Sequence, residues 1–293
     1  MPITDAEPTW SGWIPLRGAG RNQQLPVAPG LYRVRRHGGE PPLYIGQTSR
    51  SLRERLGMLG GVYAAEMPYS DPHTAGPALW ALRHLEGVDY ECSVAVIAGS
   101  RRQILAAEAV AITLHRAAFG GSPAFNFGRM PHGYRKSSGN NSRLAAAGRR
   151  FRGGPDPTVP DDQASVLVAG PLRSAPAASD WMGLSWSDWT PFGDTVGAGA
   201  IPPGSRGVYR LRDSGSDELL YVGQGVIASR FAAHARSAST PGSTKNRLFG
   251  GEVEASWVQL DHLSVRCLLE VENDLIASHV LVFGRAPASQ FAG

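Results

Sequence analysis

The stretch that decides the fold is residues 30–47, GLYRVRRHGGEPPLYIGQ, because residues 207–224 repeat its pattern as GVYRLRDSGSDELLYVGQ. In both stretches two tyrosines lie twelve positions apart, and the second tyrosine begins a Tyr-[Ile/Val]-Gly-Gln sequence. Each stretch contains two short runs rich in β-branched and aromatic residues, separated by a segment with the glycine of a loop. The pattern predicts a β-hairpin in each half of the chain.

The similarity between the two halves extends beyond these hairpins. The sequence WSGWIPL begins at Trp10 and WSDWTPF begins at Trp186. Near the end of each half, EAVAITLHRAAFGGSPAFNF begins at Glu108 and ENDLIASHVLVFGRAPASQF begins at Glu272. Several separated similarities in the same order indicate an internal duplication.

Each half is expected to form the same series of elements. After the first hairpin, Leu52, Leu56 and Leu59 form the apolar stripe of a helix. A strand near residues 90–99 and a helix near residues 100–120 follow. In the second half we expect strands near 207–212, 219–223 and 254–260 and helices from about 226 and near 264–283. The sequence therefore predicts an α+β fold of two repeated β-β-α-β-α units, each a small, mainly antiparallel three-stranded sheet flanked by helices.

The composition is that of a globular protein outside membranes. Hydrophobic residues make up 42% of the 293 positions and charged residues 18%, and no apolar run is long enough to span a bilayer. The N-terminal sequence MPITDAEPTWSGW has no signal-peptide features, and Cys92 and Cys267 lie in different halves. We therefore expect a cytoplasmic protein, and a net charge of +4 favours an anionic partner.

The segment between the two halves is rich in Gly, Ser, Pro and Ala and shows no helical or strand periodicity. We expect a first domain at residues 1–130, a linker at 131–180 and a second domain at 181–293. The beginning of the linker is basic, which is typical of a solvated tail or of a flexible arm along a phosphate backbone. The cations assigned to phosphate contacts are Arg135, Lys136, Arg149 and Arg150.

These motifs resemble those of the GIY-YIG nuclease superfamily, which is named after two tyrosine tripeptides on neighbouring strands. Residues 30–32 and 44–46 match the tripeptides in the first half, and residues 207–209 and 221–223 match them in the second. The family pattern adds an arginine on the next helix, often a histidine one turn later, a glutamate on a later helix and a terminal asparagine. The matching residues are Arg55, Glu108 and Asn126 in the first half, and Arg230, His234, Glu272 and Gln290 in the second, where Gln departs from Asn.

The resemblance implies hydrolysis of phosphodiester bonds in DNA with one divalent metal ion, Mg²⁺ or Mn²⁺. Such a reaction needs an activated water and stabilisation of charge on the phosphate oxygens. Carboxylates are ligands that Mg²⁺ accepts, and a guanidinium suits phosphate oxygens. The resemblance assigns metal binding to Glu108 and Glu272, and phosphate binding to Arg55 and Arg230. It assigns activation of water to Tyr32 and Tyr209, support of that water or contact with phosphate to Tyr44 and Tyr221, and acid–base chemistry to His234. Gly46, Gly223, Asn126 and Gln290 complete the expected substrate-binding set.

Two assignments depend on the alignment of the halves. Arg53 and Arg55 both lie on the first helix, and matching the apolar stripe of that helix to Ile227 and Phe231 places Arg55 over Arg230. This match makes the first half two residues longer. Leu59 then occupies the position that matches His234. The first site therefore lacks this histidine, unless His73 reaches the site from the loop.

A tyrosine hydroxyl also has an ordinary pKa near 10. Acting as a base at neutral pH therefore requires the metal ion or a nearby cation that stabilises the phenolate.

We expect a DNA endonuclease, a monomer with internal pseudo-symmetry and two sites suited to cutting both strands. Two alternatives stay open. One is a nucleic-acid-binding protein that does not cut, and the other is an enzyme that uses the fold for chemistry on a base or a small molecule. Residues 60–90, which do not match the family pattern, are where such a difference would lie, or where DNA would be read.

Overall fold

The computed structural model describes residues 8–70, 74–139, 142–195, 201–238 and 252–291. The chain divides into two compact units. The N-terminal unit comprises the described residues of Pro8–Ser100 and Gly121–Ser165, and the C-terminal unit comprises Arg101–Gly120 and the described residues after Ser165. His73, which was considered for the first site, lies outside the described residues.

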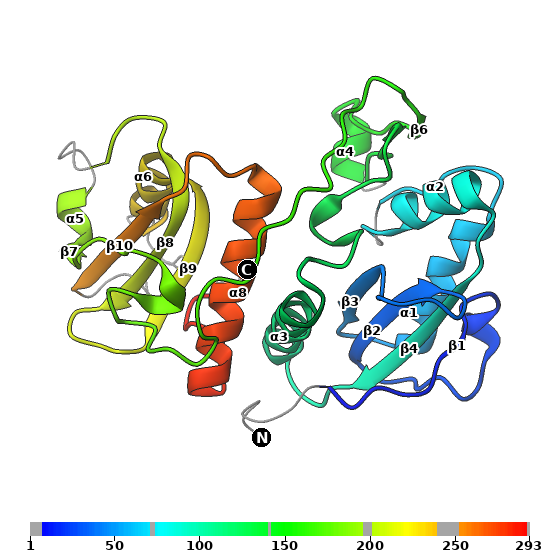
Figure 1. Ribbon diagram of the computed structural model, residues 1–293, viewed down its shortest axis with the longest axis horizontal. Coiled ribbons are helices and arrows are strands. Elements are labelled where there is room, and N and C mark those ends of the chain that lie inside the picture. Colours follow the sequence, from blue (N-terminus) through cyan, green and yellow to red (C-terminus); the bar gives the residue numbers. More distant parts are fainter. Residues whose placement is uncertain (1–7, 71–73, 140–141, 196–200, 239–251, 292–293) are drawn as a thin grey trace. The chain divides into compact units, whose positions relative to one another are not determined.

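The N-terminal unit is built around an antiparallel sheet with strand order β1-β4-β2-β3 (Figure 1). Its strands are β1 (Ile14–Pro15), β2 (Gly30–Arg36), β3 (Tyr44–Thr48) and β4 (Tyr90–Val96). Its helices are α1 (Leu52–Leu59) and α2 (Gly76–Glu86), with short 3₁₀ turns at Ala19–Arg21, Gly60–Tyr63 and Asn126–Gly128. Leu52, Leu56 and Leu59 are buried, as the apolar stripe predicted.

The C-terminal unit has a second antiparallel sheet with strand order β7-β10-β8-β9. Its strands are β7 (Thr190–Pro191), β8 (Arg206–Asp213), β9 (Leu219–Val226) and β10 (Val253–Gln259). Its helices are α3 (Arg101–Phe119), α5 (Phe192–Thr195), α6 (Ile227–Ala238) and α8 (Val265–Phe283), with a 3₁₀ turn at Trp181–Gly183. The predicted α+β class with antiparallel sheets is therefore confirmed.

The prediction of three strands in each sheet was wrong, because the described residues form four strands in the main sheet of each unit. The additional strands β1 and β7 follow the two Trp-Ser-x-Trp motifs. The Ser11 amide donates to the Val94 carbonyl at 2.8 Å, and the Ser187 amide donates to the Trp257 carbonyl at 3.0 Å. A strand of two residues has no alternation of side chains, so its sequence gives no periodic signal.

The tryptophans of these motifs pack against arginines of the central strands. The Arg210 guanidinium lies 4.2 Å from the Trp186 ring centroid and 4.5 Å from that of Trp189. In the N-terminal unit, Arg33 lies in the same way over Trp10 and Trp13, at 4.5 and 4.6 Å. Cation–π packing holds the segment before each sheet against it.

The segment at residues 60–90 contributes a helix to the core of the N-terminal unit. Helix α2 buries Leu79, whose carbonyl accepts a hydrogen bond from the Tyr90 hydroxyl at 2.6 Å. Trp80 Nε1 donates to the Ala64 carbonyl at 3.0 Å. These contacts give the segment a structural role in packing.

Helix α3 belongs to the C-terminal unit, although the predicted first domain extends to residue 130. Arg116 on α3 forms buried ion pairs with Glu270 and Asp274 on α8, each at 3.0 Å. The Thr113 hydroxyl donates to Asp274 at 2.9 Å. A buried cation between two carboxylates requires close packing of its helix, which associates α3 with α8.

The basic segment after residue 130 has short secondary structure rather than none. Strands β5 (Tyr134–Arg135) and β6 (Gly154–Pro155) pair, and helix α4 (Ser142–Ala146) lies between them in the sequence. Arg135 forms an exposed ion pair with Asp156 at 2.7 Å.

Two other basic residues of this segment are placed as follows. Arg150 lies 4.8 Å from the ring centroid of Tyr69, and Arg149 is exposed. None of the helices in the described ranges combines the length and apolarity that a bilayer crossing requires.

Candidate functional site

The two tyrosine tripeptides are neighbours across each sheet. Tyr209 on β8 pairs with Gly223 on β9, and Tyr32 on β2 pairs with Gly46 on β3. A Cβ atom on Gly223 would lie 2.5 Å from Cζ of Tyr209 and 2.7 Å from Cε1 of Tyr221. The space beside this glycine is therefore filled by the two tyrosine rings rather than by room for a ligand.

Gly46 is in the same position in the N-terminal unit. A Cβ atom there would lie 2.8 Å from Cζ of Tyr32 and 2.5 Å from Cε1 of Tyr44. The ring centroids of Tyr32 and Tyr44 are 5.9 Å apart, and those of Tyr209 and Tyr221 are 6.1 Å apart. In each unit the glycine allows the paired tyrosines to lie over one strand.

We predict that Gly223→Ala displaces both tyrosine rings. Insertion of a methyl group into a packed site costs about 1–3 kcal/mol, so the urea midpoint of the C-terminal unit should fall. Gly193→Ala is the matched control, because a Cβ atom at Gly193 meets nothing within 4 Å. An unchanged midpoint and unchanged tyrosine fluorescence in Gly223→Ala would contradict the packing described here.

Helix α6 brings Arg230 and His234 to Tyr209. The Tyr209 hydroxyl lies 2.8 Å from His234 Nε2, and Arg230 Nε donates to the same hydroxyl at 3.3 Å. Because Arg230 supplies a hydrogen to the Tyr209 oxygen, the hydroxyl proton of Tyr209 is available for His234 Nε2. The ring centroid of Tyr221 lies 5.0 Å from that of His234.

The site has a buried layer and a layer that reaches the surface. Tyr209 has 0% exposed surface and His234 has 2%. Tyr221 and Glu272 are half-buried, and Arg230 is exposed. Tyr209 therefore does not contact solvent in this structure, so the direct activation of water expected of it does not fit its position.

Burial controls the protonation of the two phenols. It raises the pKa of Tyr209, and the neighbouring Tyr221 raises it further while Arg230 lowers it. Burial likewise raises the pKa of Tyr221, and the negative charge of Glu272 adds to this effect. Both hydroxyls are consequently neutral near pH 7.

Glu272 on α8 interacts electrostatically with Arg230, Tyr209 and Tyr221. Burial raises the pKa of Glu272 to about 7, while the charge of Arg230 lowers it. The carboxylate also raises the pKa values of Tyr209 and Tyr221. Glu272 therefore belongs to the same site, in surroundings that do not fully compensate its negative charge.

The donor set of this site is compatible with a magnesium or manganese ion. The described residues contain no group of three or more His, Cys, Asp or Glu side chains that could hold a metal ion. A magnesium site can, however, use one carboxylate together with substrate phosphate and waters. An incompletely compensated carboxylate such as Glu272 would gain from a bound cation, so Glu272 is the residue that would hold it.

The terminal amides support the strands. Gln290 Oε1 accepts from the Val222 amide at 3.1 Å. Asn126 Oδ1 accepts from the Ile45 amide at 3.0 Å, and its Nδ2 donates to the Ile45 carbonyl at 2.8 Å. Each amide is 5% exposed and bonds to the central residue of a tyrosine tripeptide. Their positions indicate that they hold strands β9 and β3 in place, beneath any substrate.

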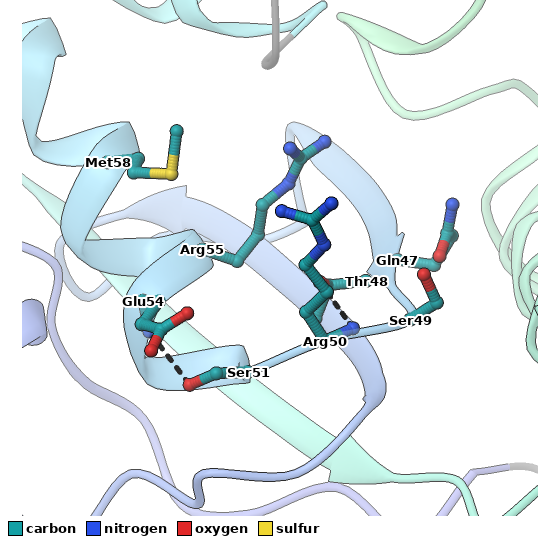
Figure 2. A pocket seen from close by; sticks show the side chains of 8 residues that line it. All are labelled: Gln47, Thr48, Ser49, Arg50, Ser51, Glu54, Arg55 and Met58. Atoms are coloured by element: carbon teal, nitrogen blue, oxygen red, sulfur yellow. Dashed lines mark hydrogen bonds between the residues drawn. The ribbon is translucent and has the colours of Figure 1, made fainter.

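The N-terminal unit brings together fewer of the expected residues. Tyr32 and Tyr44 pack together, but Leu59 is buried at the position that matches His234. Arg55 lines a surface pocket (Figure 2). Glu108 lies on α3 in the C-terminal unit, so the structure does not gather it with the tyrosines within one unit.

The choice between Arg53 and Arg55 can be compared with their contacts. Arg53 donates to the Leu25 carbonyl at 2.8 Å and to the Gln23 carbonyl at 2.9 Å, which ties it to the preceding loop. The Arg55 Nε–H is buried without a hydrogen-bond partner among the described residues. Arg53 thus has a structural role, and Arg55 is the residue available for a ligand.

Two residues of the N-terminal unit were missed by sequence reasoning. The Thr74 hydroxyl lies 3.3 Å from that of Tyr44. Thr74 comes from the unmatched segment and has no motif, so no sequence signal identifies it. Arg50 lines the same pocket as Arg55. The sequence signal for Arg50 is the additional length of the first half between the tyrosine tripeptide and the helix.

The histidine of helix α8, His279, is part of the core. His279 is fully buried; its Nε2 accepts from the Leu219 amide at 3.2 Å, and its Nδ1 lies 2.9 Å from the Arg285 carbonyl. Burial lowers the pKa of His279 to about 4. It is a neutral histidine that joins α8 to strand β9.

No protein-family model, no curated protein and no solved structure matches this chain.

Proposed function

We propose that this chain is a Mg²⁺- or Mn²⁺-dependent DNA endonuclease that hydrolyses phosphodiester bonds at the site in its C-terminal unit. The observation that carries the proposal is the hydrogen-bonded series Arg230–Tyr209–His234 beside Tyr221 and Glu272. It combines a guanidinium for phosphate, a path for a proton and a carboxylate for a metal ion.

The burial of Tyr209 suggests how a proton leaves the attacking water. Tyr221 reaches the surface, and its ring centroid lies 6.1 Å from that of Tyr209. Tyr221 accepts the proton of the water as it gives its own proton to Tyr209, and Tyr209 gives its proton to His234 Nε2. Both phenols end neutral and the imidazole carries the charge, so no free phenolate is needed, in agreement with the raised pKa values.

The other residues stabilise charge. Arg230 is exposed, so its guanidinium can bind phosphate oxygens while its Nε keeps the hydrogen bond to Tyr209. A divalent ion bound at Glu272 would polarise the phosphate and lower the pKa of a bound water. Gln290 accepts a hydrogen bond from the amide of Val222, the residue after Tyr221, and so helps to fix the position of Tyr221.

We also infer that the two sheets are copies of one β-β-α-β-α unit. Both have the same strand order, the same Trp–Arg packing and the same glycine beneath paired tyrosines. A monomer with this internal pseudo-symmetry, acting on DNA in the cytoplasm, fits the proposal.

We predict that Tyr209→Phe, Tyr221→Phe and His234→Gln each reduce DNA cleavage about 100-fold or more, because loss of proton transfer has effects of this size. The double variant Tyr209→Phe/His234→Gln should be no slower than either single variant, because residues that act as one unit are not additive. Initial rates of plasmid nicking measure both effects.

The control for these variants is Tyr69→Phe, which removes a phenol hydroxyl of the N-terminal unit and should leave the rate unchanged. Independent, multiplicative losses in the double variant would refute the proton path. Unchanged rates in all three single variants would refute the site itself.

One observation favours a second function, a DNA-binding protein that does not cut. Tyr209 and His234 are covered in this structure, and a covered relay performs no chemistry unless Tyr221 connects it to water. Cleavage that depends on Tyr221 distinguishes the two functions.

A further inference from the structure

The N-terminal unit has a surface pocket of about 300 Å³ between the end of β3 and the first turns of α1. Figure 2 shows that side chains from the loop and from the helix converge on it. Gln47, Ser49 and Arg50 come from the strand end and loop, and Glu54 and Arg55 come from the helix. The pocket is thus formed entirely within one short segment of a single unit.

The pocket contains two guanidinium groups that form no hydrogen bond or ion pair with the part of the chain that the structure describes. Arg50 is exposed and Arg55 is half-buried, and within the described residues neither forms an ion pair. The Arg55 Nε–H is buried without a hydrogen-bond acceptor. A buried donor without an acceptor is unfavourable, so the charge of Arg55 is poorly compensated by the described residues around it.

Glu54, the acid among the described residues that line the pocket, does not neutralise these charges. Glu54 is exposed, and its carboxylate forms no ion pair with either arginine among the described residues. Its backbone amide is capped by the Ser51 hydroxyl at 3.2 Å, at the first turn of α1. Two free cations next to a helix N-terminus make the pocket electropositive.

This arrangement is specific to the N-terminal unit. Three residues, 49–51, lie between β3 and α1, whereas β9 ends at Val226 and α6 begins directly at Ile227. Arg50 lies in the additional length and has no counterpart in the C-terminal unit. The longer loop therefore places a second guanidinium, that of Arg50, in the same pocket as Arg55, the residue that matches Arg230.

We propose that this pocket binds a phosphate monoester dianion, with Arg50 and Arg55 on opposite oxygens. A phosphate monoester carries a charge of about −2 above its second pKa of roughly 6, which matches two guanidinium groups, whereas an internal phosphodiester carries a single negative charge. If the proposed function holds, the source is the phosphorylated end of a DNA strand, and the N-terminal unit holds that end.

The test compares binding of single-stranded oligonucleotides that differ only at one end, by fluorescence anisotropy with the full chain in EDTA. The absence of divalent ions makes the outcome independent of cleavage. A strand with a terminal phosphate should bind about tenfold more tightly than the same strand with a hydroxyl, since a charged hydrogen-bonded pair has this effect. Arg50→Gln should abolish the preference.

Arg21→Gln is the matched control, because it removes one exposed positive charge from the same unit and should keep the tenfold preference. Equal binding of the two strands by the wild type would overturn a strand end as the ligand. In that case, titration with inorganic phosphate, followed by the Nε–Hε NMR signals of Arg50 and Arg55, decides whether the pocket takes a small phosphate instead. Absence of any shift would overturn the site.

Discussion

Glu272→Gln is expected to reduce cleavage of supercoiled plasmid at least 100-fold while the protein stays folded. The substitution removes the charge that would hold a divalent ion but keeps the size of the side chain. Burial raises the pKa of Glu272 to about 7, so its charge is unfavourable to the fold. The midpoint of urea unfolding should therefore be unchanged or higher in the variant.

The control for this experiment is Glu252→Gln, which neutralises an exposed acid of the same unit and should have no effect on either measurement. Glu108→Gln tests the other expected metal ligand. If Glu272→Gln keeps some cleavage that disappears only in the double variant Glu108→Gln/Glu272→Gln, the remaining activity depends on Glu108. Full activity of Glu272→Gln would show that the metal ligand is assigned wrongly.

Arg116→Met is expected to lower the stability of the C-terminal unit by about 3–5 kcal/mol, because removal of one partner leaves buried charges uncompensated. Arg116 is 1% exposed and is paired with Glu270 and Asp274. The urea midpoint of the C-terminal unit should fall. Because the two units can unfold in separate transitions, unfolding is followed with a probe in each unit.

Arg101→Met is the matched control, because Arg101 is an exposed arginine on the same helix α3. Adding Glu270→Gln and Asp274→Asn to Arg116→Met should recover part of the loss, because neutral groups remove the uncompensated charge. Equal midpoints for Arg116→Met and Arg101→Met would contradict the role of this network in joining α3 to α8.

Much of the sheet structure could be predicted because its signals are local. The strand expected at 207–212 is Arg206–Asp213, and the helix expected near 264–283 is Val265–Phe283. Side-chain alternation in strands and apolar stripes in helices extend over enough residues to be read. Strands β1 and β7 are too short for such a signal, and helix α2 lies in a segment without a counterpart.

The assignment of α3 to the C-terminal unit could not be predicted, because it depends on interactions between distant parts of the chain. Arg116 and Asp274 are 158 positions apart. Both lie in the repeated segments that begin at Glu108 and Glu272, but at positions that the repeat does not match with each other. Proximity along the sequence favoured a first domain that included α3. Its buried face and the charged network instead associate it with α8.

The candidate site could be predicted as a set of residues but not as a layered arrangement. The repeated motifs indicated Tyr209, Tyr221, Arg230, His234 and Glu272, and the structure places these side chains near one another. Depth below the surface depends on neighbours from several elements, so the sequence did not show that Tyr209 is covered. The same limit applies to Gly223, whose neighbours are tyrosine rings rather than a ligand.

Incubation of supercoiled plasmid with the full chain and Mg²⁺ or Mn²⁺ tests the central claim most directly. The account predicts conversion to nicked or linear DNA that requires the metal ion and stops in EDTA. A shift of the DNA on the gel without any cleavage, across duplex, branched and single-stranded substrates, would contradict it.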